Sequence, residues 1–343
     1  MELIDFDKCQ RVKGRGYRGN AGRKLAYMHD EKVWMVKFPG TTKDMVGKHL
    51  PSYTSSPLSE YVGSQIYELL GVPVHETVLG KCQGKIVVGC RDFTDKGQLL
   101  EYSQIKNMVD DELISGSYGS SGQGERLSDV LRVIETSEEF EGIRDEVRCR
   151  FWDMFVIDAF IHNNDRNNGN WGLLVGNGES TLAPVFDNGN AFFNKRNPSV
   201  FGRRLNDDRA LKEDALSGKS FFLDDDDKRI NPLEYISKSD NAECKKALSR
   251  FIDKVDMDKV RELIEEIPEE AYGLTVVDSE QKRFYIELLN ETYNDGIQPI
   301  AKSLGIIDKR VKQPSLDELC AEIEKNALPK SEVFKSKDFE QER

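Results

Sequence analysis

Residues 161–171 read IHNNDRNNGNW, and asparagine fills five of these eleven positions. The stretch follows the strongly apolar segment FWDMFVIDAF and leads into a second apolar run, GLLV. A polar loop between two buried elements is either a solvated turn or a place where the chain grips a charged ligand. Asp165 and Asn170 are the two residues on which that choice depends.

The spacing of these two residues is informative. Asp165 precedes Asn170 by five positions, which is the spacing of the D-x-x-x-x-N catalytic loop of kinases. The later segment FDNG places Asp187 after a predicted short strand and just before a glycine, as in D-F-G. Mg²⁺ prefers oxygen ligands, which Asn170 and Asp187 would supply. Asp165 would then orient the attacking hydroxyl and accept its proton.

Two upstream segments fit the same chemistry. The glycine-rich stretch 14–22 would let backbone N–H groups approach an anion, and the following RKLAYMHDEKVWMVKF predicts a hairpin rather than a dinucleotide-binding helix. Lys37 lies in the apolar run WMVKFP and needs a partner, because a buried unpaired charge is costly. Glu60 is the candidate, on a predicted helix with Ser59 as N-cap and Gly71 as stop.

Each motif taken singly has a simpler interpretation. The glycines would form a flexible turn, Lys37 would reach water from an edge strand, and the Asp and Asn residues would be turn formers. What these separate interpretations explain poorly is the order of the whole series. A glycine-rich loop, Lys, Glu, D-x-x-x-x-N and D-x-G follow one another as they do in kinases.

Composition restricts the function classes. The chain carries 61 Asp and Glu against 49 Lys and Arg, a net charge of −12, which disfavours a nucleic-acid partner. Six scattered cysteines without a C-x-x-C pair predict reduced thiols and no dedicated zinc site. No apolar run approaches the roughly 20 residues that cross a bilayer, and MELIDFDKCQ is unlike a secretory signal. We therefore expect no membrane partner and a cytoplasmic location, although export without a cleaved signal would leave no trace.

The length of 343 residues favours two packed lobes or domains. Short strands, turns and one helix are expected over residues 1–92, and helices with polar loops over 93–308. Residues 309–343 are expected to form a charged, partly disordered tail with one short helix, SLDELCAEIEK. The DDDDK run at 224–228 is expected to be a solvated turn.

The segments GNAGRK, WMVKFP, SEYVGSQI, VVGCRDF, NNDRNNGNWG and PVFDNG jointly resemble the HipA-like serine/threonine kinases, over about residues 5–305. The similarity is greatest to the short branch of cell-translocating kinases, which lacks an extra N-terminal subdomain. In this family D-R-H-x-x-N replaces H-R-D, as in phosphoinositide lipid kinases. Residues 165–170 read D-R-N-N-G-N, which resembles the family rather than typical protein kinases. The resemblance implies an α+β, bilobal protein-kinase-like or lipid-kinase-like fold with a small mixed β N-lobe and a larger, mostly helical C-lobe.

The resemblance also implies an ATP- and Mg²⁺-dependent enzyme and assigns roles by matching motif. Asp165 is implied as the catalytic base and Lys37, paired with Glu60, as the phosphate clamp. The metal ligands would be Asn170 and Asp187. The residues implied to hold the nucleotide, including a hinge whose backbone binds adenine, are Gly16, Gly19, Asn20, Ala21, Gly22, Lys37, Cys90, Arg91, Asp92 and Phe93.

The predicted function is phosphoryl transfer to a serine or threonine hydroxyl of a protein. Alternatives are a lipid or small-molecule kinase, and a non-catalytic module that binds a nucleotide or a partner. An antitoxin-like regulator is doubtful, since the chain starts too close to its glycine-rich loop to contain the longer members' N-terminal region. Autophosphorylation is a hypothesis motivated by expected exposure alone. Its candidate sites are Ser117, Ser120, Ser121 and Ser199.

Three lesser signals lie in and after the asparagine-rich loop. His162 lies three residues before Asp165 and is expected either to brace the loop or to face solvent, rather than to take part in chemistry. Arg166 is expected either to brace the catalytic loop or to meet phosphate. A basic cluster after Asp187 would hold an acidic substrate or form a solvated loop. Its members are Lys195, Arg196, Arg203 and Arg204.

Overall fold

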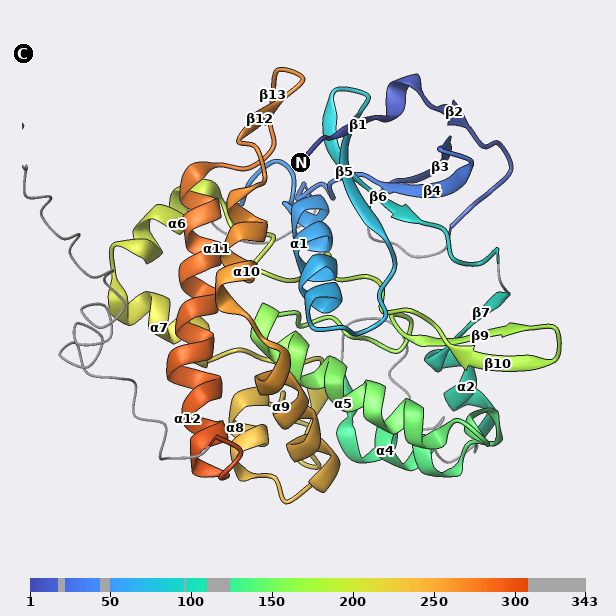
Figure 1. Ribbon diagram of the computed structural model, residues 1–343, viewed down its shortest axis with the longest axis vertical. Helices are drawn as coiled ribbons and strands as arrows, with labels where there is room; N and C mark the ends of the chain where they lie inside the picture. The colour runs from blue at the N-terminus through green and yellow to red at the C-terminus, as the bar shows by residue number, and fades with distance from the viewer. Residues whose placement is uncertain (18–21, 44–49, 96, 110–123, 308–343) are drawn as a thin grey trace, which may run out of the picture. The chain divides into compact units, whose positions relative to one another are not determined.

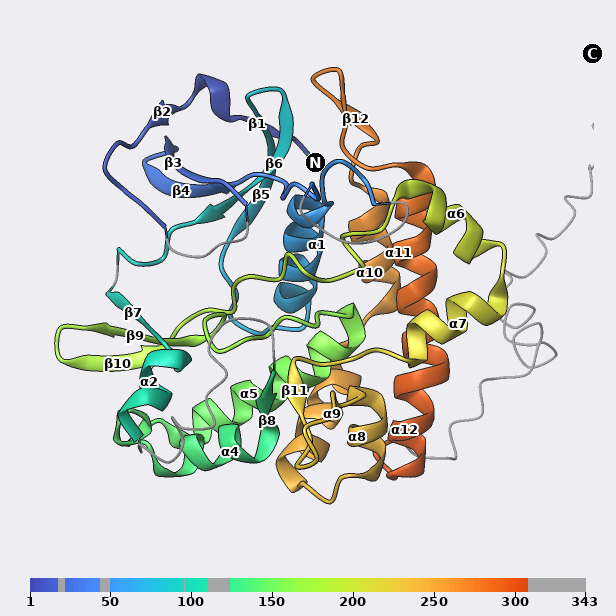
Figure 2. The ribbon, with the colours of Figure 1, turned by 180° about the vertical axis from the view of Figure 1, so that it is seen from behind.

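The structure is a computed structural model that describes residues 1–17, 22–43, 50–95, 97–109 and 124–307 (Figures 1 and 2). The chain divides into two compact units, Met1–Ile306 and Ile307–Arg343. All described helices and strands lie in the first unit. The predicted tail helix lies outside the described residues, and the lobe boundary at 92/93 stays a prediction. Also outside them are Gly19, Asn20, Ala21, Ser117, Ser120 and Ser121.

The described strands and helices follow the order expected of an α+β chain. The strands are β1 (Ile4–Asp5), β2 (Gln10–Arg11), β3 (Lys24–His29), β4 (Lys32–Lys37), β5 (Thr77–Cys82), β6 (Lys85–Arg91), β7 (Gln98–Glu101), β8 (Glu125–Arg126), β9 (Gly172–Gly176), β10 (Glu179–Leu182), β11 (Phe222–Leu223), β12 (Glu270–Ala271) and β13 (Leu274–Thr275). The helices are η1 (Phe6–Lys8), α1 (Ser56–Leu69), α2 (Tyr102–Val109), α4 (Leu127–Thr136), η2 (Glu138–Phe140), α5 (Arg144–Ile161), α6 (Pro198–Leu205), α7 (Asp208–Leu216), α8 (Pro232–Lys238), α9 (Ala242–Lys254), α10 (Met257–Glu265), α11 (Ser279–Glu291), the π-helix η3 (Thr292–Ile297) and α12 (Gln298–Ser303). None of these helices is long and apolar enough to span a membrane.

The N-terminal part forms a mixed sheet of six strands in the order β1-β5-β6-β4-β3-β2. Strand β1 runs parallel to β5, and the other neighbours are antiparallel. The predicted hairpin is confirmed as β3–β4. Its two turn residues, Asp30 and Glu31, have φ of 48° and 60°, which suits a type I′ connection. This turn sets a register in which Lys24 lies opposite Lys37.

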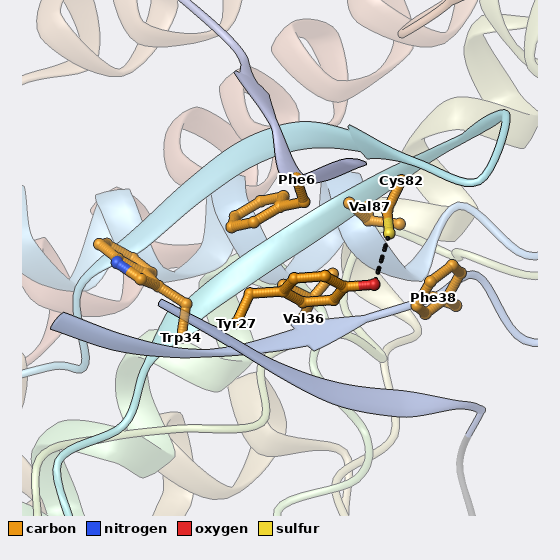
Figure 3. Close-up of a cluster of buried hydrophobic side chains, with 7 residues drawn as sticks. All are labelled: Phe6, Tyr27, Trp34, Val36, Phe38, Cys82 and Val87. Atoms are coloured by element: carbon orange, nitrogen blue, oxygen red, sulfur yellow. Dashed lines mark hydrogen bonds between the residues drawn. The ribbon is translucent and has the colours of Figure 1, made fainter. Parts of the chain in front are cut away.

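One face of this sheet carries an aromatic cluster (Figure 3). The Cys82 thiol donates to the Tyr27 hydroxyl at 3.3 Å within it. The ring of Phe6 lies so close to β6 that a Cβ at Gly89 would come within 2.5 Å of its Cζ atom. The cluster consists of Phe6, Tyr27, Trp34, Val36, Phe38, Cys82 and Val87. Because side chains alternate along a strand, Lys37 points to the opposite face, where α1 packs on β5 and β6.

Helix α1 begins one turn earlier than predicted. Ser55, not Ser59, is the N-cap residue, and the Ser59 N–H donates to the Ser55 carbonyl at 3.0 Å inside the helix. Pro57 explains the earlier start, because proline is well placed in a first turn. The predicted end is confirmed, since Gly71 follows the helix with φ of +67°. Glu60 is consequently a buried interior residue of α1.

Helix α5 leads directly into the asparagine-rich loop. It is apolar nearly all round and packs against α4, α8 and α9, so it is central, as predicted. It ends at Ile161, and the C-cap residue His162 has left-handed backbone with φ of 57°. Beyond the loop, β9 pairs with β7 and β10.

The segment LAPVFDNG is not the second strand that we predicted. The partner of β9 is β10, which ends at Leu182. The chain then leaves that ladder through Pro184, which lacks an N–H donor, and forms only a single bridge between Val185 and Val74. The run 224–228 is an exposed turn, as expected.

Candidate active site

Lys37 joins β4 to α1 and to the loop after the Val185 bridge. Its Nζ lies 3.0 Å from Glu60 Oε2 and also forms an ion pair with Asp187 Oδ1. Lys37 is 9% exposed and Glu60 2% exposed. The partner predicted for the buried lysine is therefore the observed one, and a second carboxylate joins it from the D-x-G segment.

These three groups hold one another in their charged forms. Burial alone would raise the pKa of Glu60 and of Asp187. The Lys37 ammonium, together with the His75 hydrogen bond at Glu60 and the Lys24 charge at Asp187, holds both pKa values below their ordinary values. Burial would likewise lower the pKa of Lys37, but the Asp187 and Glu60 carboxylates raise it well above normal. The cluster therefore presents one fixed cation between two fixed anions.

The catalytic-type loop is shaped by hydrogen bonds of its own asparagines. The side-chain amide of Asn170 donates from Nδ2 to the Asp165 carbonyl at 2.6 Å, and Asn167 Nδ2 lies 3.0 Å from Asp165 Oδ1. Because a carbonyl can only accept, the Asn170 nitrogen must face it, which leaves Asn170 Oδ1 for another group. Asp165 itself is half-buried.

Arg166 connects this loop with the segment that carries Asp187. Its guanidinium binds Asp158 through two contacts, Nε to Oδ2 at 2.8 Å and Nη2 to Oδ1 at 2.9 Å. It also donates to the carbonyls of Phe186 at 2.6 Å and of Asn170 at 3.2 Å. Arg166 is 2% exposed, so of the two roles considered for it the structure supports the loop brace. One guanidinium thus brings the backbones beside Asp187 and Asn170 together.

The oxygen groups of this region fit a hard divalent cation. Asn170 binds its own loop through Nδ2, which leaves Oδ1 out of that bond, and Asp187 is ionised and keeps Oδ2 out of the Lys37 contact. An amide oxygen and a carboxylate are the donors that Mg²⁺ accepts. Asp187 has φ of 57°, a conformation that aspartate tolerates better than most residues.

The glycine-rich loop reaches the hinge through Asp92. Arg15 Nε lies 2.5 Å from Asp92 Oδ2, and the Tyr17 hydroxyl donates to the same oxygen at 2.8 Å. Gly16, between them, is exposed. At the other end of the loop Gly22 has φ of +70°, and a Cβ there would lie 2.9 Å from the Phe38 carbonyl. A side chain at Gly22 would therefore be strained and would strike the backbone after β4.

The predicted hinge residues divide into two groups. Cys90 and Arg91 belong to β6, and the segment outside the sheet begins at Asp92. The N–H groups of Arg91 and Asp92 donate to Glu76 at 2.8 Å and Val33 at 2.9 Å. The Phe93 N–H has no acceptor among the residues that the structure describes.

Sequence reasoning missed Lys24. It pairs with Lys37 across the β3–β4 ladder, so both side chains emerge on the same face of the sheet. Its charge also helps to hold the pKa of Asp187 down. The signal was present, because a two-residue turn at Asp30 and Glu31 fixes this register.

The basic cluster after Asp187 is partly neutralised. Arg196 binds Asp214 at 2.5 and 2.7 Å, and Arg204 Nε lies 3.3 Å from the same carboxylate. Lys195 and Arg203 are exposed. Two of the four cations therefore fix the segment in place, and the substrate-binding hypothesis now depends on the other two.

Glu60, His75 and Cys90 place donor atoms within 4.8 Å of one another. Burial raises the pKa of the Cys90 thiol far above its ordinary range, and Glu60 already binds Lys37. A transition metal needs the thiolate, which this environment disfavours. The donor set does not fit a zinc site.

His162 has a structural position, as expected. Its Nε2 lies 2.8 Å from Thr292 Oγ1, and its ring stacks on Phe193. Burial lowers the pKa of His162 from 6.5 to about 4.

This shift predicts a pH-dependent stability. The unfolded chain binds the proton more readily, so the free energy of unfolding should fall as pH drops from about 6.5 to about 4. The loss attributable to His162 should approach about 3 kcal/mol, by linkage over that interval. Urea unfolding of wild type and His162→Gln at several pH values measures it. If the free energies of unfolding of wild type and His162→Gln change in parallel between about pH 6.5 and about pH 4, the effect does not come from His162.

The architecture and the site together define a class. A mixed sheet that carries a buried Lys–Glu pair, set against helices that present two loops joined by an arginine, is a bilobal kinase fold. No protein-family model matches the chain. A curated relative, the serine/threonine-protein kinase CtkA of Helicobacter pylori, is 35% identical over 276 residues, covering 78% of this chain and 80% of the relative.

A solved structure of this relative agrees with the assignment. The crystal structure of the Helicobacter pylori proinflammatory kinase CtkA matches with a TM-score of 0.77 and 31% identity, over 89% of this chain and 99% of that chain. A chain from the complex of the Shewanella oneidensis MR-1 toxin–antitoxin system HipA, HipB and its operator DNA has a TM-score of 0.49 and 12% identity, over 85% of this chain and 67% of that chain. The chain belongs to the CtkA family of HipA-like serine/threonine kinases.

Proposed function

We propose that this protein transfers the γ-phosphoryl group of ATP, with Mg²⁺, to a serine or threonine hydroxyl of a protein. The observation that carries the proposal is the buried Lys37 held by Glu60 beside Asp187, because kinases position nucleotide phosphates with this pair. The 35% identity to a serine/threonine-protein kinase supports the choice of acceptor.

Each residue of the site has its own role in the proposed phosphoryl transfer. Lys37 binds the phosphates, with Lys24 on the neighbouring strand adding positive charge. Asn170 and Asp187 would hold Mg²⁺, which neutralises charge on the transferred group. Asp165 orients the acceptor hydroxyl and accepts its proton, while Arg166 keeps the two loops in register. The glycine-rich loop, with Gly16 and Gly22, covers the phosphates, and the Phe93 backbone meets adenine.

A lipid acceptor is less well supported. Such an enzyme needs a basic membrane-facing surface. The net charge of −12 and the neutralisation of Arg196 and Arg204 by Asp214 speak against one. A non-catalytic module would have no chemical need for an ionised Asp187 beside Lys37.

Metal dependence tests the proposal. Wild type, incubated with γ-labelled ATP, Mg²⁺ and a generic protein acceptor, should yield phosphoserine or phosphothreonine, and excess EDTA should abolish the transfer. Asp187→Asn should lower the rate by about two to four orders of magnitude, because a metal ligand and its charge are lost together. Amino-acid analysis of the labelled product identifies the acceptor residue.

Asp253→Asn is a matched control, since it removes the same charge from an exposed position. It should transfer label as wild type does. Label transfer by Asp187→Asn at the wild-type rate, or by wild type in EDTA, would contradict the proposal.

A further inference from the structure

His75 lies behind the Lys37–Glu60 pair and takes no part in the chemistry proposed above. Its side chain is 1% exposed, and its Nε2 lies 3.0 Å from Glu60 Oε1. An ionised carboxylate can only accept a hydrogen bond, so this contact requires the proton on Nε2. No described residue provides Nδ1 with a hydrogen-bond partner. The imidazole therefore binds Glu60 through Nε2.

The contact controls which way the Glu60 carboxylate turns. Glu60 Oε2 is used by Lys37, and Oε1 receives His75 and the backbone N–H of Asn188 at 3.1 Å. Without His75, Oε1 would keep a single donor among these groups. Lys37 also contacts Asp187, so a less firmly held Glu60 would leave the ammonium to that carboxylate alone.

His75 is itself held firmly enough to direct its neighbour. Its backbone N–H donates to the Val185 carbonyl at 3.0 Å, and Nε2 also lies 3.3 Å from Ser64 Oγ. Its ring meets the Phe93 ring edge-on, with centroids 6.5 Å apart. The imidazole is thus placed by the hinge, by α1 and by the segment that precedes Asp187, and little of it is free to reorient.

We propose that His75 is a positioning residue for phosphoryl transfer: its Nε2–H orients Glu60, and Glu60 in turn holds Lys37 between the two carboxylates, so that the ammonium is not bound by Asp187 alone. The inference rests on the proposed function. It assigns His75 no contact with ATP and no proton transfer. Its effect should therefore appear both in kcat and in KM for ATP, and should disappear when Glu60 can no longer act.

Two amide variants separate this role from simple packing. Glutamine can place its amide nitrogen near the Nε2 position, whereas asparagine reaches only the Nδ1 position. His75→Gln should retain kcat/KM for ATP within about threefold. His75→Asn should lose roughly tenfold to a hundredfold, the cost of one hydrogen bond to a charged group. Calorimetry measures ATP binding independently of turnover. The affinity for ATP should fall for His75→Asn and stay at the wild-type level for His75→Gln.

The Glu60→Gln background makes the test specific. If His75 acts through Glu60, His75→Asn should lower kcat/KM by less than about threefold in that background. Gln65→Leu is the matched control, because it removes a different side-chain contact of α1, the 3.4 Å bond to Thr77 of β5, away from Glu60. It should leave kcat/KM unchanged.

Equal losses in the two amide variants, or a full loss from His75→Asn in the Glu60→Gln background, would overturn the inference. If His75→Asn does not fold, His75→Gln decides alone, because the proposed role requires it to remain within threefold of wild type. Wild type is measured first in the same assay. A wild type without transfer rejects the proposed kinase function, whereas an active wild type with insensitive His75 variants rejects only the positioning role.

Discussion

Replacing Asp165 by asparagine is expected to lower kcat by about two to four orders of magnitude, the contribution of a positioned general base. Asparagine has nearly the same shape, and Asn170 bonds to the backbone carbonyl of residue 165 rather than to its side chain. The loop should therefore keep its conformation. What the variant loses is a negatively charged acceptor for the hydroxyl proton.

ATP binding separates this loss from a general failure of the site. Lys37, Glu60 and Asp187 are untouched by the substitution, so the affinity for ATP with Mg²⁺ should stay within a few-fold of wild type in calorimetry. Turnover is measured under saturating ATP, so that kcat is read directly. Loss of ATP binding together with activity would show that Asp165 shapes the site instead of acting in the chemical step.

The matched control is Asn164→Ala, an exposed neighbour in the same loop. It alters the loop without touching the carboxylate, and it should transfer phosphate as wild type does. Wild-type turnover by Asp165→Asn would rule out a base at this position. A contaminating kinase that copurifies with both proteins would also give equal turnover of wild type and variant.

The parts of the site that could be predicted from the sequence are those in which a charged group lies in an apolar element and needs a partner. A lysine inside an apolar strand needs a carboxylate, and the structure provides Glu60 as expected. The β3–β4 hairpin could be predicted as well, because the strand pattern and the turn signal that define it are local in the sequence. Element boundaries were less accurate: Pro57 moved the start of α1, and Pro184 prevented the strand predicted over LAPVFDNG.

Residues whose partners lie far away in sequence were harder to predict. Asp158 lies in the apolar run FVIDAF, which indicates a buried carboxylate that needs a cation. Nothing local in the sequence indicates that Arg166 folds back to bind it. His75 gives even less warning, since its role depends on how β5 begins beside α1. The clamp of the glycine-rich loop on Asp92 by Arg15 also joins segments that only the folded sheet brings together.

Arg166→Met should have the largest effect on stability, with a loss of about 3–5 kcal/mol. The substitution leaves the Asp158 carboxylate buried without its cation, although the Tyr67 hydroxyl at 2.8 Å and Asn163 Nδ2 at 3.1 Å still bind it. Methionine fills much of the volume of the arginine stem, so the loss should come from charge rather than from a cavity. Urea unfolding at neutral pH measures it through the transition midpoint.

A second substitution identifies the cause. In the Arg166→Met/Asp158→Asn double variant no charge remains to be compensated, and asparagine keeps an oxygen and a donor for the neighbouring groups. The double variant should therefore be more stable than Arg166→Met alone. Arg126→Met is the matched control: it breaks an exposed ion pair with Asp227, which water can replace, and its midpoint should stay close to that of wild type. A double variant no more stable than the single one would mean that Arg166 stabilises the fold through its carbonyl contacts to Phe186 and Asn170, and that the buried charge of Asp158 is not what makes the arginine necessary.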